Sequence, residues 1–288
     1  MSINIQTIAD IRKLLREELS GLYNEKETES VTNVVLKYVF SIDKLFRLAD
    51  PGFKITEESV ERILQISDEL KTGKPVQYIV GETEFYGLRI KVNGSVLIPR
   101  NETEELVDLV IRENGNFNGT ICDLCTGSGC IAIALAGNMP GARIYGTDIS
   151  EEAIDTAREN ARINKADIGF FAADLMEPWP ASIPGPGIIV SNPPYVTGPE
   201  KHLMHSNVMD FEPHTALFVP DSDPLVFYRR LLELCSSLLP KNGRFYFEIN
   251  ESMGGRTAEM AAGFGMHQVE IIKDLNGKDR IIKGTNNG

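Results

Sequence analysis

Helix-like and strand-like segments alternate along the chain from Thr103 onward, and no other feature of the sequence limits the possible folds as strongly. Five segments are predicted strands because they are short, apolar and rich in β-branched and aromatic residues: "GTICDLCTG", "ARIYGTDIS", "IGFFAADL", "GIIVSNPPY" and "GRFYFEIN". The segments between them have helical spacing. Strands that alternate with helices form a mostly parallel sheet covered on both faces, so we predict a doubly wound α/β fold.

The end of the chain departs from this alternation. The segment "HQVEIIKDLNGKDRIIKG" contains two strand-like runs joined through Asn276-Gly277, a dipeptide that favours tight hairpin turns. It predicts an antiparallel hairpin that closes one edge of the sheet.

The start of the chain has a helical pattern. From Ile5 to about Leu70, apolar residues recur at three-and-four spacing, as on the buried face of a helix. One helix is expected to end at Asp50-Pro51-Gly52, and the next is expected to begin with Thr56 as its N-cap. We predict three regions: a small N-terminal all-helical domain over residues 1–75, a β-hairpin connector over 76–100, and the sheet domain over 101–288.

The amino-acid composition limits which kinds of binding partner are expected. The chain has 29 Lys and Arg against 41 Asp and Glu, a net charge of -12. Binding dominated by phosphate needs basic side chains, so no direct binding of nucleic acid is expected. No apolar run reaches the ~18 residues of a membrane helix, and four cysteines without a regular spacing fit reduced thiols. We therefore expect a cytoplasmic protein without a membrane partner.

A glycine-rich turn follows the first predicted strand of the sheet, in "DLCTGSGCIAIA". Gly127 and Gly129 let the backbone approach a ligand, and the helix that begins near Cys130 offers unpaired N–H groups. Asp148 ends the next predicted strand, where it can accept hydrogen bonds from ribose hydroxyls. Together with Ala132, the two glycines also fit the G-x-G-x-x-A pattern of dinucleotide-binding proteins. This turn alone does not separate a dehydrogenase from a methyltransferase.

Two further acids bear on that choice. Asp123 lies in the strand before the glycines, and Asp174 ends "FFAAD". A carboxylate at the first position suits a cationic amino-acid group, and one at the second suits an adenine amine. S-adenosylmethionine carries both groups. NAD would instead place its pyrophosphate near Asp123, where like charges repel.

A second motif, Asn192-Pro193-Pro194-Tyr195, ends another predicted strand. The Asn192 side-chain oxygen can accept an N–H hydrogen bond, and the prolines fix the direction of a nearby carbonyl. Two fixed acceptors can hold an NH2 group and orient its nitrogen toward a methyl donor, while Tyr195 packs on a planar amide or base. The alternative is a turn without chemistry, because Asn-Pro commonly starts turns.

Two other pairs carry a weaker signal. Cys122 and Cys125 have C-x-x-C spacing, but this single pair straddles a predicted buried strand, so structural thiols are favoured. His202 and His205 lack a matching acid pair, so solvated histidines are favoured over metal ligands. No metal site is predicted.

The segments "DLCTGSGCIAIALA", "TDIS" and "NPPY" together resemble class I S-adenosylmethionine-dependent methyltransferases that act on planar nitrogens. The segments "GKPVQYIVGETEFYGL", "LIPRNETEELVD", "FEPHTALFVPDSDPLVFYRRLLE" and "KDLNGKDRIIKG" resemble the release factor glutamine methyltransferases, the HemK/PrmC family. The resemblance spans most of the chain. It implies a class I methyltransferase fold and methylation of N5 of the glutamine in the Gly-Gly-Gln motif of peptide chain release factors, a modification in translation termination. The helical domain would help to recognise the release factor.

The resemblance also implies roles for residues at matching positions. The expected cofactor is S-adenosylmethionine, which becomes S-adenosylhomocysteine after methyl transfer. With the two acids considered above included, the residues expected to bind it are Asp123, Cys125, Thr126, Gly127, Ser128, Gly129, Asp148, Asp174, Trp179 and Asn192. The expected catalytic set is Asn192, Pro193, Pro194 and Tyr195, with Arg100 and Glu102 near the active site. Cys125 departs from the family pattern, in which glycine is common at that position.

Two other functions stay open at this point. A nucleic-acid adenine or guanine N-methyltransferase would use the same NPPY chemistry, but it needs a basic groove that the acidic composition does not favour. A cofactor-binding protein without catalytic activity would keep the glycine turn and would need no receptor for an amide.

Overall fold

The computed structural model describes residues 5–41, 53 and 55–288. The chain divides into two compact units with these segments: Met1–Gly81 with His205–Phe211 in the smaller, and Glu82–Met204 with Glu212–Gly288 in the larger. Within the described residues, no helix combines the length and the apolar character that crossing a membrane requires.

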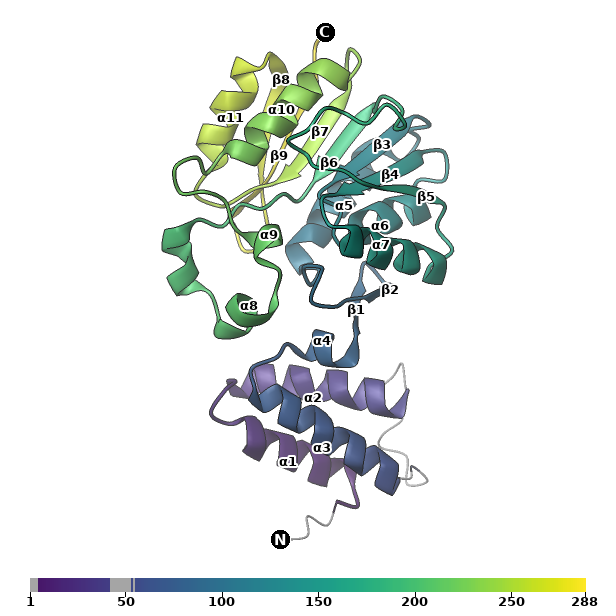
Figure 1. Cartoon of the computed structure of the whole chain (residues 1–288), viewed down its shortest axis with the longest axis vertical. Helices are drawn as coiled ribbons and strands as arrows, with labels where there is room; N and C mark the ends of the chain where they lie inside the picture. The colour runs from purple at the N-terminus through teal and green to yellow at the C-terminus, as the bar shows by residue number, and fades with distance from the viewer. Residues whose placement is uncertain (1–4, 42–52, 54) are drawn as a thin grey trace. The chain divides into compact units, whose positions relative to one another are not determined.

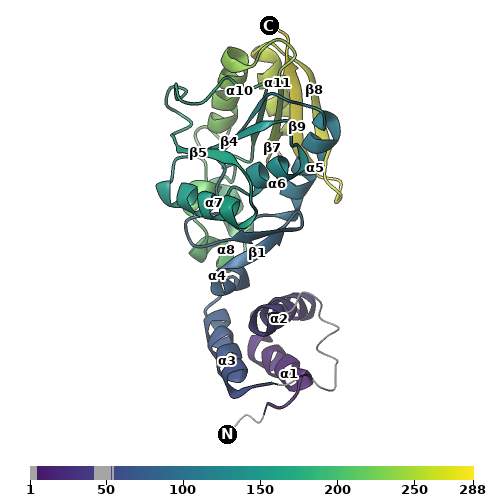
Figure 2. The same cartoon turned by 90° about the vertical axis from the view of Figure 1, so that its right-hand side faces the viewer.

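Helices form the smaller unit (Figures 1 and 2). Its described elements are α1 (Ile8–Leu19), α2 (Glu25–Phe40), α3 (Glu57–Lys71), α4 (Val76–Val80) and α8 (Ser206–Phe211). The long helices start where side chains cap them: Thr7, Asn24 and Thr56 each accept a hydrogen bond from a backbone N–H of the first turn. The apolar faces of the first four helices meet in one core, in which Ile11 and Leu36 are fully buried.

Two predictions for this part of the chain have different outcomes. Thr56 is the N-cap of α3, and its hydroxyl oxygen accepts a hydrogen bond from the Ser59 backbone N–H at 3.2 Å, which confirms the predicted helix start. The helix end predicted at Asp50-Pro51-Gly52 lies outside the described residues.

The region predicted as a β-hairpin connector, 76–100, begins with a helix instead. Helix α4 starts after Pro75, whose φ of -55° is compatible with a helix, and it ends at Gly81 in the left-handed conformation. Three of its residues, Val76, Ile79 and Val80, have helical spacing and join the core of the smaller unit. Burial of this face against the neighbouring helices outweighs the β-branched composition of the segment.

A central sheet organises the larger unit (Figure 1). Its strands are β3 (Thr120–Leu124), β4 (Arg143–Asp148), β5 (Ile168–Ala172), β6 (Ile188–Ser191), β7 (Arg244–Glu248), β8 (Met266–Lys273) and β9 (Asp279–Asn286). Their spatial order within the described residues is β5-β4-β3-β6-β7-β9-β8. The first five are parallel, and β9 is antiparallel to both β7 and β8. This confirms the predicted mostly parallel, doubly wound sheet with an antiparallel C-terminal hairpin at one edge.

Helices cover both faces of this sheet (Figure 1). One face carries α5 (Asn101–Asn114), α6 (Cys130–Asn138) and α7 (Glu151–Ile163), and the other carries α10 (Val226–Leu238) and α11 (Gly254–Gly263). Two shorter helices, η2 (Gly198–Leu203) and α9 (His214–Leu217), lie between β6 and α10 in the chain. Every residue of β3 and β6 is buried, as expected for central strands between two helical layers.

A short hairpin, β1 (Glu82–Phe85) with β2 (Leu88–Lys91), belongs to the larger unit. It is attached through Asn160 of α7, which is fully buried. The Asn160 Oδ1 accepts from the Lys91 N–H at 2.7 Å, and its Nδ2 donates to the carbonyl oxygens of Lys91 and Ser128, each at 2.9 Å. One side chain thus fixes the hairpin and the glycine-rich turn to the same helix.

We predict that Asn160→Ala destabilises the protein by about 2–3 kcal/mol, because it leaves the Lys91 N–H and two carbonyl oxygens without their partner, of which the Ser128 oxygen is buried. Urea denaturation of the two proteins measures the loss. The matched control is Asn138→Ala, which removes an exposed side chain with one hydrogen bond to its own helix and should cost no more than about 0.5 kcal/mol. Equal losses in the two variants would contradict the role of Asn160.

Candidate functional site

The carboxyl ends of the parallel strands meet at one edge of the sheet, where α/β proteins place ligand sites. A cavity of about 310 Å³ lies there within the larger unit. Nine of the residues predicted from the sequence line it: Arg100, Cys125, Thr126, Gly127, Ser128, Asp148, Asp174, Asn192 and Pro194. Most of the remaining wall is apolar and includes Ile149, Phe218 and Phe227.

The turn between β3 and α6 shapes one side of the cavity. Cys125, Gly127 and Gly129 have left-handed backbones, with φ of 59°, 52° and 79°. A Cβ atom on Gly127 would meet no atom within 4 Å, so the space beside it is open. A Cβ atom on Gly129 would lie 3.0 Å from the Cβ of Ala157, so this glycine permits close packing of α6 on α7 and does not line the cavity.

Cys125 has a conformation that a residue with a Cβ atom adopts only at a cost. Glycine adopts the same conformation freely, which is a physical reason for the glycine that is common at this position in the family pattern. The Cys125 side chain also borders the cavity. The departure from the pattern therefore changes both the backbone strain of the turn and the shape of the wall.

Asp148 ends β4 and carries a carboxylate into the cavity wall. Its Oδ2 accepts from the Gly127 N–H at 2.8 Å, and its Oδ1 accepts from the Ser150 N–H at 3.0 Å. Burial raises the pKa of Asp148, and the backbone N–H groups counteract this rise. The carboxylate holds the glycine-rich turn in place and still has acceptor capacity toward the cavity, because each oxygen can accept more than one hydrogen bond.

Asp123 lies behind the turn, on β3, and is fully buried. Its Oδ2 accepts from the Thr126 hydroxyl at 2.5 Å, whereas its Oδ1 has no hydrogen-bond partner among the described residues. Burial raises the pKa of Asp123 to about 7, although the Thr126 hydroxyl and the Ala132 backbone N–H favour the charged form. Asp123 does not line the cavity. It is linked to the cavity only through its hydrogen bond with Thr126, which does line it.

Asp174 and Trp179 follow β5 and have different positions. Asp174 lines the cavity, and its Oδ1 accepts from the Met176 N–H at 2.8 Å. Trp179 packs against the core of the sheet, and its indole N–H donates to the Ile183 carbonyl oxygen at 3.0 Å. The indole ring lines a smaller neighbouring cavity that Asp174 also borders. The structure therefore brings Asp174 to the main cavity and Trp179 to its neighbour.

Asn192 follows β6 directly and faces the same cavity as the glycine-rich turn, because β6 lies beside β3. Its Nδ2 donates to the Thr103 hydroxyl oxygen at 3.2 Å. Of the two prolines, Pro194 lines the cavity and Pro193 is buried away from it. The segment is held by backbone bonds, since the N–H groups of Tyr195 and Val196 both donate to the Leu217 carbonyl oxygen.

Tyr195 does not line the cavity in this structure. Its ring packs against the core cluster of α10 and β7, and its hydroxyl donates to Glu248 Oε1 at 2.9 Å. Burial and the neighbouring Glu248 carboxylate raise the pKa of Tyr195 well above its usual value. The hydroxyl therefore stays protonated and acts as a hydrogen-bond donor.

Arg100 and Glu102 sit at the start of α5. Arg100 lines the cavity and forms an ion pair with the buried Glu212, with 2.5 Å between its guanidinium nitrogen and Oε1. Glu102 lies in the first turn of the helix, where the helix dipole stabilises a carboxylate, and it does not line the cavity.

Several polar residues near the cavity were not predicted from the sequence, and two of them, Thr103 and Glu248, contact each other. Thr103 lines the cavity and donates its hydroxyl hydrogen to Glu248 Oε2 at 2.7 Å. The signal that could have identified Glu248 is a carboxylate at the end of the otherwise apolar run "FYFE", since a charged residue in a central strand is costly to bury. Thr103 gave no such signal, because a threonine in the first turn of a helix is common.

The cysteines near the turn are free thiols. Burial raises the pKa of Cys122 and of Cys130 to about 12, and it raises the pKa of Cys125 as well. Thiols that stay protonated are neither nucleophiles nor metal ligands. Within the described part of the chain, no group of three or more His, Cys, Asp or Glu residues could hold a metal ion.

Comparison with known proteins gives two family matches and close relatives. A family model described as the methyltransferase small domain matches residues 103–211, and one described as the PrmC N-terminal domain matches residues 10–81. A release factor glutamine methyltransferase of Flavobacterium psychrophilum is 40% identical over 96% of this chain and 98% of its own length. One of Bacteroides thetaiotaomicron is 40% identical over 94% and 98%. A crystal structure of a methyltransferase from Pyrococcus furiosus, 15% identical, superimposes on 81% of this chain and all of its own with a TM-score of 0.52 and shares the fold.

The raised pKa of Asp123 predicts a pH-dependent effect of Asp123→Asn. Because the folded-state pKa of about 7 lies above the ordinary value of 3.8, the native state binds more protons than the unfolded state between these values, and this group destabilises the protein increasingly as the pH rises. Asparagine has no such charge. From about pH 5 to about pH 8, the unfolding free energy of Asp123→Asn should therefore gain about 2–3 kcal/mol relative to that of the original protein.

Urea denaturation at several pH values measures this difference. Asp155→Asn is the matched control, because it removes an exposed carboxylate from α7. A difference between Asp123→Asn and the original protein that stays constant over this pH range would show that Asp123 does not titrate there.

Proposed function

We propose a protein-glutamine methyl transfer for this chain, which belongs to the release factor glutamine methyltransferase family. The reaction would add a methyl group to the side-chain amide nitrogen, N5, of the glutamine in the Gly-Gly-Gln motif of peptide chain release factors. The observation that carries the proposal is that the Asn192 carboxamide and the glycine-rich turn with Asp148 line one cavity.

The residues of the cavity fit S-adenosylmethionine as the methyl donor. Gly127 leaves open space beside the turn, and the Asp148 carboxylate has acceptor capacity for ribose hydroxyls. The Asp174 carboxylate lines the cavity and would accept a hydrogen bond from the adenine amine, while Asp123 lies behind the turn and would act on the amino group through Thr126. When bound, S-adenosylmethionine supplies a methyl group on a positively charged sulfur, and S-adenosylhomocysteine remains after transfer.

In the proposed mechanism, Asn192 and the prolines after it act on the substrate amide. The Asn192 Oδ1 accepts one N–H hydrogen bond from the glutamine side chain. The Pro193 carbonyl oxygen would accept the second after a small movement of the segment, because Pro193 does not line the cavity in this structure. Holding both hydrogens turns the nitrogen, whose lone pair is normally delocalised into the amide, toward the methyl group. The N–CH3 bond forms as the S–CH3 bond breaks, and the nitrogen then releases one of its two hydrogens as a proton to water. Catalysis then depends on orientation and electrostatics and not on a strong base.

The apolar part of the wall has a separate role. Phe218 and Phe227 border the cavity, and we propose that they limit the access of water to a bound ligand. A dry wall favours a reaction in which positive charge is dispersed, because water would stabilise the concentrated charge of the ground state. We propose that Tyr195 supports this wall by packing behind Pro194, and that it contacts the substrate amide only if the segment moves on binding.

We propose that the smaller unit helps to recognise the release factor. Its sequence matches the PrmC N-terminal domain, and its helices carry none of the residues that line the cavity.

A nucleic-acid substrate is less well supported, because the chain carries 41 acidic against 29 basic residues. The cytoplasm is the proposed location, since all four cysteines are free thiols, as in a reducing compartment.

The proposed reaction predicts a mass gain of one methylene group on a release factor. An unmethylated release factor is incubated with the protein and S-adenosylmethionine, and peptide mass spectrometry locates the gain on the Gly-Gly-Gln glutamine. Asn192→Ala should lower the rate by about ten- to a hundredfold or more, because the substrate N–H loses its acceptor. Asn138→Ala is the control, as its side chain is exposed and lies outside the cavity. Methylation of added RNA or DNA instead of the release factor would refute the proposed substrate.

Asp148→Ala is predicted to weaken the binding of S-adenosylhomocysteine by about ten- to a hundredfold, through loss of hydrogen bonds to a charged group. Isothermal titration calorimetry measures the affinity. Asp155→Ala serves as the control, because it removes an exposed carboxylate from the helix that follows Asp148. Unchanged affinity in Asp148→Ala would remove Asp148 from the cofactor site.

A further inference from the structure

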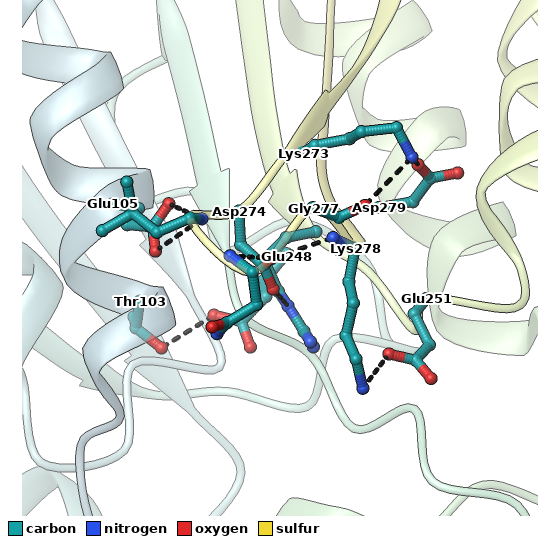
Figure 3. A network of polar contacts seen from close by, with 12 residues as sticks. Thr103, Glu105, Glu248, Glu251, Lys273, Asp274, Gly277, Lys278 and Asp279 are labelled. Atoms are coloured by element: carbon teal, nitrogen blue, oxygen red, sulfur yellow. Dashed lines mark hydrogen bonds and ion pairs between the residues drawn. The ribbon is translucent and has the colours of Figure 1, made fainter.

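Glu248 is a buried carboxylate that the proposed mechanism does not use. It ends β7, the neighbour of β6, and it is 1% exposed. Its Oε2 accepts from the Thr103 hydroxyl at 2.7 Å, and its Oε1 accepts from the Tyr195 hydroxyl at 2.9 Å. Figure 3 shows Thr103 on α5 facing Glu248 across this short distance. Each carboxylate oxygen thus has a hydroxyl donor, as a buried charge requires.

The polar neighbours of Glu248 oppose the effect of its burial. Burial raises the pKa of Glu248 and the Glu102 carboxylate adds to that rise, while the Thr103 and Tyr195 hydroxyls and the positive charge of Arg280 act in the opposite direction. Arg280 is itself fixed, because its Nε lies 3.2 Å from Oδ2 of the buried Asp274. The C-terminal hairpin therefore places a stationary positive charge near Glu248.

The hydrogen bonds from Glu248 to Asn192 have a fixed direction. Both oxygens of Glu248 accept hydroxyl hydrogens, one from Thr103 and one from Tyr195, so the single hydroxyl hydrogen of Thr103 points to Glu248. The Thr103 oxygen can then only accept, and it accepts from Nδ2 of Asn192 at 3.2 Å. Rotating the Asn192 amide by half a turn would place its Oδ1 against the Thr103 hydroxyl oxygen, with no hydrogen between the two atoms.

We propose that Thr103 and Glu248 are positioning residues that hold the Asn192 carboxamide with its NH2 group on Thr103 and its Oδ1 available to the substrate amide. This inference rests on the proposed function. It extends that function, because it says what orients the Asn192 acceptor. A hydrogen-bonded chain of three side chains does so: Thr103 of α5, Glu248 of β7 and Asn192 at the end of β6. A substrate nitrogen that carries hydrogens matches such an acceptor, whereas a carboxylate would face it oxygen to oxygen.

The test compares variants of the full chain with the original protein in release-factor methylation, together with calorimetric binding of S-adenosylhomocysteine. Thr103→Val keeps the shape of the side chain but removes both hydrogen bonds of the hydroxyl. It should lower kcat/KM by about tenfold or more, because the Asn192 amide loses its fixed orientation, and cofactor affinity should change by less than about threefold. Thr103→Ser retains the hydroxyl and should restore most of the rate.

Thr257→Val is the matched control for this substitution. Thr257 is a fully buried threonine of α11 whose hydroxyl donates to the Met253 carbonyl oxygen, far along the chain from the cavity residues. The Thr257→Val variant tests whether the loss of any buried threonine hydroxyl lowers the rate of methylation. If Thr103→Val is as active as Thr257→Val, or if Thr103→Ser is as slow as Thr103→Val, the positioning role is wrong.

Glu248→Gln provides a second, chemically different variant. Its amide can donate to Thr103, which frees the Thr103 hydrogen to turn toward Asn192 and reverses the chain of hydrogen bonds. Glu248→Gln should therefore be slowed by about as much as Thr103→Val, and the double variant should be no slower than either, because all three break the same coupling. Additive losses in the double variant would overturn the proposal. Failure of the original protein to methylate any release factor would refute the proposed function itself, before the variants are compared.

Discussion

The parallel pairing of β3 with β6 is the interaction on which the whole site depends. Leu124 and Ser191 are partners in register, and the Ser191 hydroxyl donates to the Leu124 carbonyl oxygen at 2.6 Å, although the two residues are 67 positions apart. Because both strands run in the same direction, the glycine-rich turn and the Asn-Pro-Pro-Tyr segment leave the sheet at the same edge. One cavity can therefore present groups for a cofactor and an amide receptor side by side.

Two buried carboxylates support this cavity in different ways. Glu248 has a hydroxyl donor on each oxygen and lies near the charge of Arg280, so its burial is compensated within the fold. Asp123 has one hydroxyl donor and one oxygen without a partner among the described residues. A buried oxygen without a partner costs stability. The first carboxylate holds protein groups on both of its oxygens, whereas the second lies behind the glycine-rich turn and reaches the cavity through Thr126.

Local patterns in the sequence predicted which segments of the sheet form strands and helices. They predicted less well the segment that joins the two units. The strand, helix and hairpin segments of the sheet were predicted correctly, because period and turn residues reflect backbone conformation directly. Val76–Val80 was predicted as part of a β region and forms a helix, since its apolar residues are buried on one face by the helices of the smaller unit. That burial involves residues far away in the chain, which a short window of sequence does not contain.

The sequence by itself determined the fold class, the family and the segments that carry the chemistry, because these depend on residue type and spacing within short stretches. Only the tertiary structure decided which side chains border the cavity. Trp179 and Tyr195 lie in motifs near the site, yet their polar atoms are bound to Ile183 and Glu248 and neither lines the main cavity. Thr103 and Glu248, 145 positions apart, meet beside Asn192. Such contacts arise from the packing of α5 against the sheet and from strand order, which no single stretch of sequence specifies.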